Sequence, residues 1–385
     1  GTTSSAASDV YKRQEQAFAS LGEVRLVPGR GMQAAQVQDA DILLVRSVTA
    51  VDQALLENSA VRFVGSATIG FDHVDRAYLQ QHGIGFATAP GCNATSAAEY
   101  VVSALLVLAQ RKGFALAGKS VGIIGCGNVG SRVRERVAAL GMHCVVNDPP
   151  LQDQGGHDDF VSLEEVLQAD IITVHVPYTR DGAYPTHHLV DEAVLRKLQP
   201  GALFINTSRG AVTDNRALDA LLAERDDLSV VLDVWEGEPA INTSLLQRVD
   251  LGTPHIAGYS LDGKLRGTEM IYRAACDWFG LPGQWRAADF LPAGSVVDCS
   301  EPGDMSASAM LRAAVLGSYD IRADDARLRT MLSLPVGEQP DYFDRLRKEY
   351  PVRREFSTCS VLVGEAGGEY EPLLRGLGFP VVVSA

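Results

Sequence analysis

The segment "DVWEGEP", residues 233–239, carries three carboxylates directly behind the apolar run "LSVVL". That run has the composition of a buried strand, and the residues that follow a strand usually lie at the surface. Asp233, Glu236 and Glu238 are therefore either solvated at a strand end or delivered to a site that uses acid–base chemistry. The neighbouring strand ends decide between these two possibilities.

Two further apolar segments also end in ionisable residues. "ALFINTSRG" ends next to Arg209, and "LGTPHIAG" places His255 after a proline. In open parallel sheets, ligands bind outside the carboxyl ends of the strands. Taken singly, Arg209 is compatible with a surface ion pair, His255 with the core and Glu238 with a solvated turn. Their occurrence at successive strand ends of one sheet favours a common site.

These residue types suit the oxidation of an alcohol by hydride transfer. The reaction needs a base for the hydroxyl proton, and histidine titrates near neutral pH. A carboxylate beside the ring would orient it and stabilise its protonated form. An arginine can bind a substrate carboxylate through two hydrogen bonds and so place the neighbouring carbon. We predict Arg209, Glu238 and His255 as catalytic residues, with Asp233 facing the cofactor and Glu236 solvated.

A glycine loop predicts the cofactor. "VGIIGCGNVG" spaces Gly125, Gly127 and Gly130 as G-x-G-x-x-G between an apolar strand and a helical segment. In that context the glycines let backbone N–H groups approach a pyrophosphate at a helix N-terminus. The next strand, "HCVVND", ends in Asp148, eighteen positions after Gly130. A carboxylate there can accept hydrogen bonds from both ribose hydroxyls and would repel a 2′-phosphate, so we predict NAD rather than NADP.

Two series of apolar strands alternating with helical segments position these residues. The first begins near residue 41, and the second runs from about 120 to 257. A long helix at 96–112 joins them, with Ser96 and Glu99 spaced as a capping box. The pattern predicts an α/β fold of two Rossmann-like, doubly wound domains with a cleft between them. After a linker that contains proline and glycine, the mixture of helical and strand-like segments in residues 286–385 predicts a small α+β region.

The composition of the 385 residues excludes several classes of function. A formal net charge of −14 disfavours a nucleic-acid or anionic-membrane partner, because both require a basic face. The six cysteines are scattered without metal-ligand spacing, which is typical of buried thiols in a reducing compartment and predicts no metal site. No apolar run approaches the ~20 residues of a membrane span. We therefore expect a cytoplasmic protein.

Four motifs, "GCGNVG", "NTSRGAVTDNRAL", "DVWEGEP" and "TPHIAG", resemble the successive signatures of the D-2-hydroxyacid dehydrogenase family, over roughly residues 40 to 280. The resemblance implies a substrate-binding domain at 1–92 and 257–285 around an NAD-binding domain at 93–256. It also implies the Arg209, Glu238 and His255 arrangement. The cofactor-binding residues that we expect from the glycine loop and from the resemblance are Gly125, Gly127, Asn128, Val129, Gly130, Asp148, Val176, Thr207, Ser208, Asp233 and Gly258.

Other segments narrow the resemblance within that family. "FVGSATIGFDHVD", "HIAGYSLDGKLRGT" and "YPVRREF" resemble a branch that oxidises a phosphorylated four-carbon hydroxyacid. The branch implies that 286–385 is a dimerisation domain forming a homodimer, and that Ser47, Thr68 and Tyr259 contact substrate. Arg46, at a strand end, is our candidate for the substrate phosphate, with a surface ion pair as its alternative role. Arg353 and Arg354 are further candidates if a partner's tail covers the cleft.

One segment departs from the family. The family opens with a strand and a turn, whereas residues 1–14, "GTTSSAASDVYKRQ", are polar and small. We expect this stretch to be foreign or disordered, leaving the substrate-binding sheet one strand short. Two alternative functions stay open at this point. One is a 3-phosphoglycerate or broad D-2-hydroxyacid dehydrogenase, and the other is an NAD-sensing binding protein without turnover.

Overall fold

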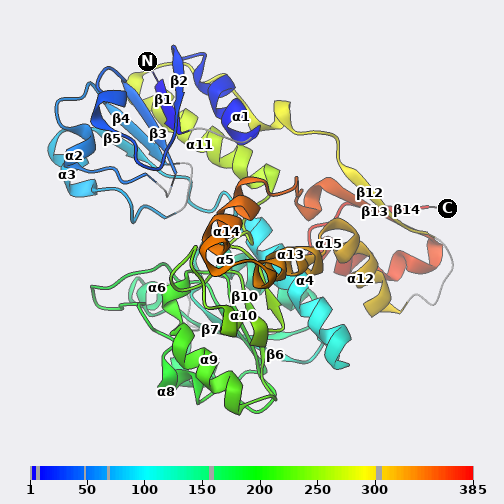
Figure 1. The fold of residues 1–385 in the computed structure, drawn as a ribbon. Coiled ribbons are helices and arrows are strands. Elements are labelled where there is room, and N and C mark those ends of the chain that lie inside the picture. Colours follow the sequence, from blue (N-terminus) through cyan, green and yellow to red (C-terminus); the bar gives the residue numbers. More distant parts are fainter. Residues whose placement is uncertain are drawn as a thin grey trace. The chain divides into compact units, whose positions relative to one another are not determined.

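In the computed structural model of the protein, the chain divides into two compact units (Figure 1). The first comprises Gly1–Asn93 with Ser260–Pro292, and the second Ala94–Tyr259 with Ala293–Ala385. The residues that the structure describes are 2–5, 9–46, 49–66, 70–155, 160–300 and 306–384. Among these residues no helix combines the length and the apolar character needed to cross a membrane. The α/β class with parallel sheets is confirmed.

The first unit is built on a five-stranded parallel sheet of order β2-β1-β3-β4-β5. Its strands are β1 (Thr2–Ser5), β2 (Val24–Val27), β3 (Ile42–Val45), β4 (Phe63–Ser66) and β5 (Gly85–Ala87). Its helices are α1 (Asp9–Phe18), α2 (Gln53–Leu56), α3 (Arg76–Gln81) and α11 (Leu261–Phe279), with the 3₁₀ helices η1 (Ala34–Gln36) and η3 (Ala287–Phe290). Phe18 of α1 meets Tyr272 of α11 edge to face at 5.5 Å, which fixes both helices on the same core.

The expectation that this sheet lacks a strand is wrong. Thr2–Ser5 forms β1 and lies between β2 and β3, pairing in parallel with both. Small polar residues can fill such a position because the backbone ladder, and not the side-chain pattern, makes the pairing.

The second unit holds a six-stranded parallel sheet of order β11-β10-β9-β8-β6-β7. Its strands are β6 (Ser120–Ile124), β7 (His143–Asn147), β8 (Ile171–Val174), β9 (Leu203–Asn206), β10 (Ser229–Leu232) and β11 (Leu251–Gly252). Its helices are α4 (Ala94–Lys112), α5 (Asn128–Ala139), α6 (Pro149–Asp153), α7 (Leu163–Val166), α8 (Glu192–Leu195), α9 (Asn215–Glu224) and α10 (Thr243–Arg248), with the 3₁₀ helix η2 (Gly210–Val212). From β6 the chain adds β7 on one side of the sheet and then β8 on the other side. A doubly wound sheet binds its ligand where the strand order reverses in this way.

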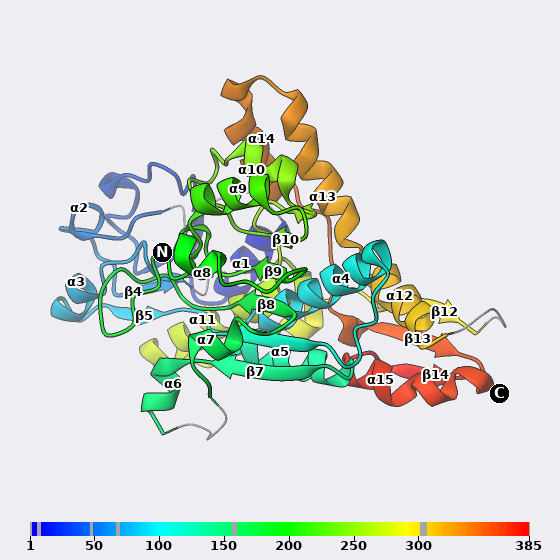
Figure 2. The same ribbon diagram turned by 90° about the horizontal axis from the view of Figure 1, so that it is seen from below.

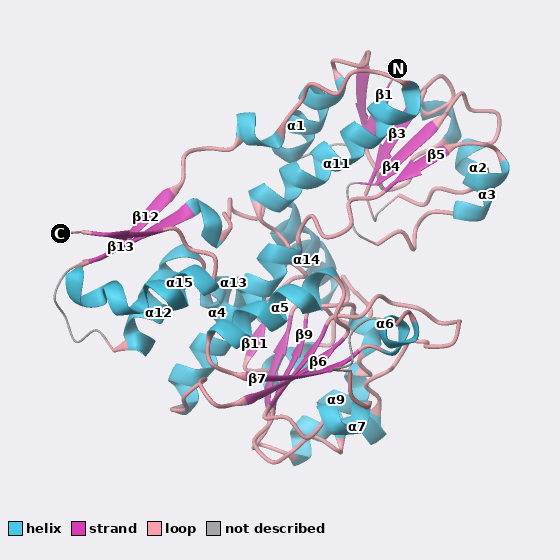
Figure 3. Cartoon of the chain, turned by 180° about the vertical axis from the view of Figure 1, so that it is seen from behind, coloured by secondary structure: helices cyan, strands magenta, loops and turns pink. Residues whose placement is uncertain are grey.

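Helices cover both faces of this sheet (Figures 2 and 3). Alternate residues of β8 show the two sides, since Ile171 packs in the cluster with α4 and α5 whereas Ile172 packs with α7 and α9. A strand buried on both faces needs a continuous apolar sequence, which explains why β8, β9 and β10 are buried along their whole length.

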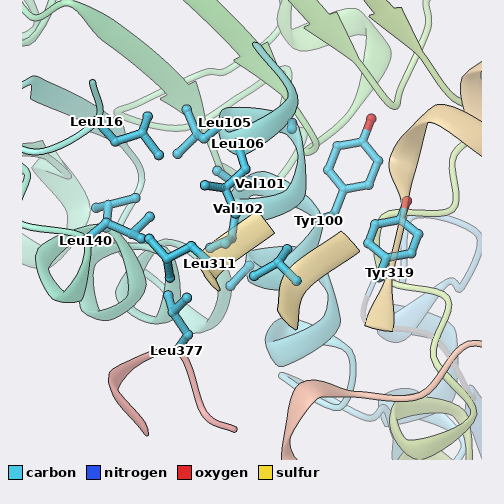
Figure 4. Close-up of a cluster of buried hydrophobic side chains, with 14 of the residues drawn as sticks. Tyr100, Val101, Val102, Leu105, Leu106, Leu116, Leu140, Leu311, Tyr319 and Leu377 are labelled. Atoms are coloured by element: carbon cyan, nitrogen blue, oxygen red, sulfur yellow. The ribbon is translucent and has the colours of Figure 1, made fainter. Parts of the chain in front are cut away.

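The C-terminal elements of the second unit form a three-stranded parallel sheet of order β12-β13-β14. Its strands are β12 (Ser295–Cys299), β13 (Cys359–Val363) and β14 (Val381–Val383). Its helices are α12 (Ala307–Ser318), α13 (Ile321–Arg329), α14 (Gln339–Lys348) and α15 (Glu371–Gly376), with the 3₁₀ helices η4 (Thr330–Ser333), η5 (Val336–Glu338), η6 (Phe356–Thr358) and η7 (Glu365–Tyr370). Figure 4 shows Leu311 and Leu377 of this region packed in one cluster with Leu105 and Leu140.

The capping box predicted at the start of the long helix does not form. Helix α4 begins at Ala94, so Ser96 lies inside its first turns and is buried. Glu99 is also fully buried, and its Oε1 accepts a hydrogen bond from the Phe356 N–H at 2.8 Å. The local pattern is overridden because a distant segment, folded against α4, uses the carboxyl group.

Candidate active site

The glycine loop joins β6 to α5 with a geometry that requires glycine at positions 125 and 130. Gly125 adopts a φ of +89°, in the left-handed region. A Cβ on Gly130 would lie 2.0 Å from the Gly125 carbonyl oxygen, so strand and helix approach each other through bare backbone. Around Gly127, the N-cap of α5, a Cβ would meet no atom of the described residues within 4 Å. This open side, at the N-terminus of a helix, fits the phosphates of a dinucleotide.

Asp148 lies beside that loop, at the end of β7. Its Oδ2 accepts from the Cys126 N–H at 2.7 Å, and its Oδ1 accepts from the Leu151 N–H at 3.0 Å, capping α6. Both bonds fix the carboxylate in place while each oxygen keeps a further lone pair. Such a fixed acceptor next to a dinucleotide loop suits ribose hydroxyls and disfavours a phosphate in their place.

The strand ends next to the loop carry Val176 and Thr207. A Cβ on Gly125 would lie 2.8 Å from Cγ1 of Val176, so the valine borders the loop. Thr207 Oγ1 lies 3.1 Å from Nδ1 of His175, whose Nε2 lies 2.8 Å from Thr173 Oγ1. Burial lowers the pKa of His175 to about 3, so this ring is neutral at physiological pH. Sequence reasoning misses His175, which extends the apolar run of β8 without a distinguishing motif.

Asp233 anchors the turn that follows β11. Its side chain is 1% exposed and accepts from Thr253 Oγ1 at 2.6 Å, the Ile256 N–H at 2.7 Å and the Ala257 N–H at 2.9 Å. Burial raises the pKa of Asp233, although these bonds and the nearby His255 oppose the shift. The carboxylate therefore holds residues 253–257 at the end of β10. Its contact with the cofactor stays a prediction.

His255 and Glu238 form a directly bonded pair. Nδ1 of His255 donates to Oε2 of Glu238 at 2.8 Å, and the other carboxylate oxygen accepts from the Trp235 N–H at 2.7 Å. Burial alone would raise the pKa of Glu238, but the charge of His255 and its hydrogen bond outweigh burial and lower it. Glu238 is therefore ionised at neutral pH. With Nδ1 engaged, Nε2 is the ring nitrogen through which His255 can exchange a proton.

Arg209 occupies the adjacent strand end, after β9. Its Nη1 donates to the Ser208 carbonyl at 2.8 Å, and Ser208 itself is tied to Asn206 Oδ1 through its N–H and its hydroxyl. The next residue, Gly210, touches the Trp235 carbonyl so closely that a Cβ would lie 2.0 Å from it. The loops that carry Arg209 and Glu238 are thus held backbone to backbone.

Glu236, which we predict to be solvated, is only partly exposed, since its side chain is 31% accessible. Nε2 of His188 donates to Glu236 Oε1 at 2.7 Å, and the Glu236 N–H donates to Asn215 Oδ1 at 3.0 Å. The side chains of His188, Asp214 and Glu236 are partly buried, and their carboxylate oxygens and ring nitrogen, atoms of the kind that bind metals, lie within 4.8 Å of one another. The loop at 186–190 returns to the strand end and supplies the histidine, which the spacing within "DVWEGEP" cannot reveal.

The predicted substrate contacts divide into those that the structure describes and those it does not. Ser47 and Thr68 lie outside the described residues. Arg46 directly follows β3 in the first unit and is partly buried. Tyr259 lies in the second unit, edge-on to Tyr350 at 5.8 Å between ring centroids.

Three C-terminal arginines differ sharply in their surroundings. Arg353, a predicted phosphate contact, is 5% exposed and donates to the backbone carbonyls of Ala257 and Ser96 instead. Arg354 donates to the Ala293 carbonyl at 3.4 Å. Arg347 of α14 lies 6.0 Å from the centroid of the Tyr259 ring, and its charge contributes to the lowered pKa of Glu238. Sequence reasoning misses Arg347, because its segment "RLRKEY" has the composition of a charged helix face.

Comparison with known families identifies two regions of the chain. Residues 96–257 match the "D-isomer specific 2-hydroxyacid dehydrogenase, NAD binding domain", and residues 290–378 match "Domain of unknown function (DUF3410)". Erythronate-4-phosphate dehydrogenase of Escherichia coli O1:K1 / APEC is 50% identical over 366 residues, which cover 95% of each chain. The Citrobacter koseri protein of the same name is 49% identical over the same coverage.

Solved structures show the same fold. NAD⁺-bound 3-phosphoglycerate dehydrogenase of Entamoeba histolytica aligns with a TM-score of 0.62 and 25% identity, over 72% of this chain and 95% of that one. D-Lactate dehydrogenase of Aquifex aeolicus, complexed with NAD and lactic acid, aligns with a TM-score of 0.60 and 24% identity, over 73% and 96%. These alignments cover about three quarters of the chain, and the Rossmann-like architecture is common to all three proteins.

Proposed function

The chain belongs to the erythronate-4-phosphate dehydrogenase family, and from that premise we propose that it oxidises 4-phospho-D-erythronate at C2 with NAD. The product is 3-hydroxy-2-oxo-4-phosphooxybutanoate, and the step belongs to pyridoxal 5′-phosphate biosynthesis. The observation that carries the proposal is 50% identity over 95% of both chains, in a protein that keeps the Glu238–His255 pair intact. A 3-phosphoglycerate or broad hydroxyacid dehydrogenase is not favoured, because the similarity extends through the C-terminal region.

In this mechanism each catalytic residue of the second unit has a separate role. Arg209 binds the substrate carboxylate and fixes C2 and its hydroxyl. His255 takes the hydroxyl proton on Nε2 as the C2 hydride leaves, and ionised Glu238 stabilises the ring that has gained the proton. NAD supplies the hydride acceptor. Gly125, Gly127 and Gly130 would hold its pyrophosphate and Asp148 its adenosine ribose.

The substrate phosphate needs cationic or N–H donors, since an uncompensated buried charge costs several kcal/mol. We assign this role to Arg46, and we propose Ser47, Thr68 and Tyr259 as further substrate contacts. Arg347 joins them as a candidate because its charge lies near Tyr259 and Glu238.

Arg46→Met is expected to lower kcat/KM for 4-phosphoerythronate by roughly 10- to 100-fold, the range for a charged hydrogen-bonding group. The loss for unphosphorylated erythronate should be much smaller. Steady-state NADH formation with 4-phosphoerythronate, erythronate and 3-phosphoglycerate measures both losses. Arg62→Met is the control, because it removes an arginine of the same unit that stacks on Phe279. Equal use of erythronate by the wild type would reduce the proposal to a general 2-hydroxyacid dehydrogenase, and an NAD-binding protein without turnover would form no NADH.

Asp148→Ser is expected to narrow the preference for NAD over NADP, because it removes the carboxylate that would repel a 2′-phosphate. The ratio of kcat/KM values for the two cofactors measures the effect. Asp153→Ser is the control, since Asp153 ends the same short helix and bonds to Tyr184 instead of the glycine loop. A wild-type enzyme that uses NADP as well as NAD contradicts the assignment.

For the organisation of the chain we propose a substrate-binding domain at 1–92 and 257–285, an NAD-binding domain at 93–256 and a dimerisation domain at 286–385. Support for the homodimer comes from the three-stranded C-terminal sheet. Val296 on β12 and Val382 on β14 are 66% and 51% exposed, on either side of the central strand β13. Open apolar strand surfaces of this kind mark association sites, and a second copy of the same sheet offers the same apolar surface.

Val382→Lys is expected to shift the protein toward monomer because it places a charge in the proposed dimer interface. Light scattering across a dilution series measures the mass. Val336→Lys is the control, because Val336 is 80% exposed but lies on η5, outside the sheet. A dimer unchanged by Val382→Lys and by Val296→Lys contradicts this interface. We further propose a cytoplasmic location, in keeping with six cysteines that form no disulfide in the described residues and with the negative net charge of the chain.

A further inference from the structure

Arg353 connects the C-terminal region to the turn that carries the candidate catalytic histidine. Its Nη1 donates to the Ala257 carbonyl at 3.0 Å and its Nη2 to the Ser96 carbonyl at 2.6 Å. The guanidinium lies 3.6 Å from the centroid of the Tyr319 ring, and Nη2 lies 4.0 Å from Glu99 Oε2. All of these contacts lie within the second unit, and the side chain is 5% exposed.

The carbonyl that Arg353 binds belongs to a short and tightly held turn. The Ala257 N–H donates to the Asp233 carboxylate, and the His255 N–H donates to the Asp233 carbonyl at 2.7 Å. The amide side of the turn is thus fixed by Asp233 and the carbonyl side by Arg353. The turn positions His255 at one end and the candidate ligand-binding residues Gly258 and Tyr259 at the other.

A buried arginine is costly unless its donors are satisfied and its charge is balanced. The Arg353 guanidinium donates to two backbone carbonyls, stacks on the Tyr319 ring and lies beside the carboxyl group of Glu99. Burial raises the pKa of Glu99 to about 8, although the charge of Arg353 opposes the shift. The hydrogen bonds of the guanidinium go to the Ala257 and Ser96 carbonyl oxygens, and the first of these belongs to the turn that carries His255. No lysine could reach both carbonyls with the same planar geometry.

We propose that Arg353 is a positioning residue for the reaction, which sets the placement of His255 and Gly258 by holding the Ala257 carbonyl. The proposal rests on the function assigned above and extends it, because it makes the C-terminal region a part of the catalytic machinery. A displacement of about 1 Å at a reacting group is enough to lower turnover by roughly 10²-fold.

The test compares Arg353→Met and Arg353→Lys with a matched control, Arg136→Met. Arg136 of α5 also bonds to the C-terminal region, through a 2.9 Å bond from Nη1 to the Gly376 carbonyl, which is not part of the turn at 253–260. We expect Arg353→Met to lower kcat roughly 10- to 100-fold, with Arg353→Lys between it and the wild type. Arg136→Met should lower Tm while leaving kcat within about twofold of the wild type.

Hydrogen–deuterium exchange of the peptide spanning residues 253–260 supplies a readout that needs no substrate. Exchange should accelerate in both Arg353 variants and stay unchanged in Arg136→Met, because the Ile256 and Ala257 amides are protected by Asp233 only while the turn is held. Unchanged kcat and exchange in the Arg353 variants would overturn the proposal, as would equal losses in Arg136→Met. A wild type inactive on 4-phosphoerythronate, with accelerated exchange in the Arg353 variants, would instead reject the proposed substrate and keep the positioning role.

Discussion

Replacing His255 by asparagine is expected to lower kcat by roughly 10²–10⁴-fold, the range for loss of a general acid–base group. Asparagine is the suitable substitute because His255 has a φ of 58°, and asparagine tolerates this left-handed conformation better than most residues. Its amide can still bond to Glu238, so the local fold should persist. NADH affinity, measured by fluorescence titration, is therefore expected to stay close to that of the wild type.

His188→Asn is the matched control for this variant. His188 also has a positive φ, 49°, and also donates to a glutamate of the same segment, Glu236, at 2.7 Å. The kcat of this variant is expected to remain within a few-fold of the wild type, because the ring has no role in the proposed proton transfer. A His255→Asn enzyme with wild-type turnover would remove the mechanism proposed above.

Glu238→Gln is expected to lower kcat by roughly 10²-fold or more, for a reason different from loss of the base. A glutamine can offer its amide N–H to Nδ1 of His255, which leaves the ring proton on Nε2, where the substrate proton must be accepted. In molecules with the productive tautomer, the ring that has gained the substrate proton lacks its carboxylate partner, so its positive charge is no longer balanced. Steady-state NADH formation with 4-phosphoerythronate measures the loss of turnover.

The same substitution has a defined effect on stability. The pKa of Glu238 is lowered in the folded protein, so its ionised form stabilises the fold at pH values above the ordinary glutamate pKa of 4.5. That contribution is lost as the pH falls through the lowered folded-state value. The difference in Tm between the wild type and Glu238→Gln should thus be largest near neutral pH and shrink in acid. Glu236→Gln is the control for turnover, and a Glu238→Gln enzyme with the kcat of the wild type contradicts the proposed role of the pair.

Local sequence signals predict the strand ends of the second unit well. We can predict the glycine loop, the apolar strands and the residues after them because each sequence pattern spans only about ten positions. The signals fail where a partner lies far away in the chain. Glu99 is spaced from Ser96 as a capping residue, yet its carboxyl group binds the Phe356 N–H. Glu236 follows a strand like a solvated residue, yet the loop at 186–190 brings His188 to it.

Strand β1 escapes prediction for another reason. Thr2–Ser5 has none of the apolar pattern of a buried strand, but its backbone pairs in parallel with both β2 and β3. Arg353 is a third case, since its basic type suggests an anionic ligand and its burial directs it to carbonyl oxygens. Charge is visible in a sequence, whereas the environment of a charge is set by packing.

The packing of α4 against the C-terminal region also bears on how the chain is made. Ser103 in this helix donates to the Tyr319 carbonyl, 216 positions further along, and Leu105 shares a cluster with Leu311 and Leu377. At a synthesis rate of roughly 5–20 residues per second, a delay on the order of 10–40 s separates the helix from its cover on the ribosome. During that interval an apolar face of α4 is open to solvent and to other nascent chains. The demand for chaperones should therefore peak late in translation, just before the C-terminal elements emerge.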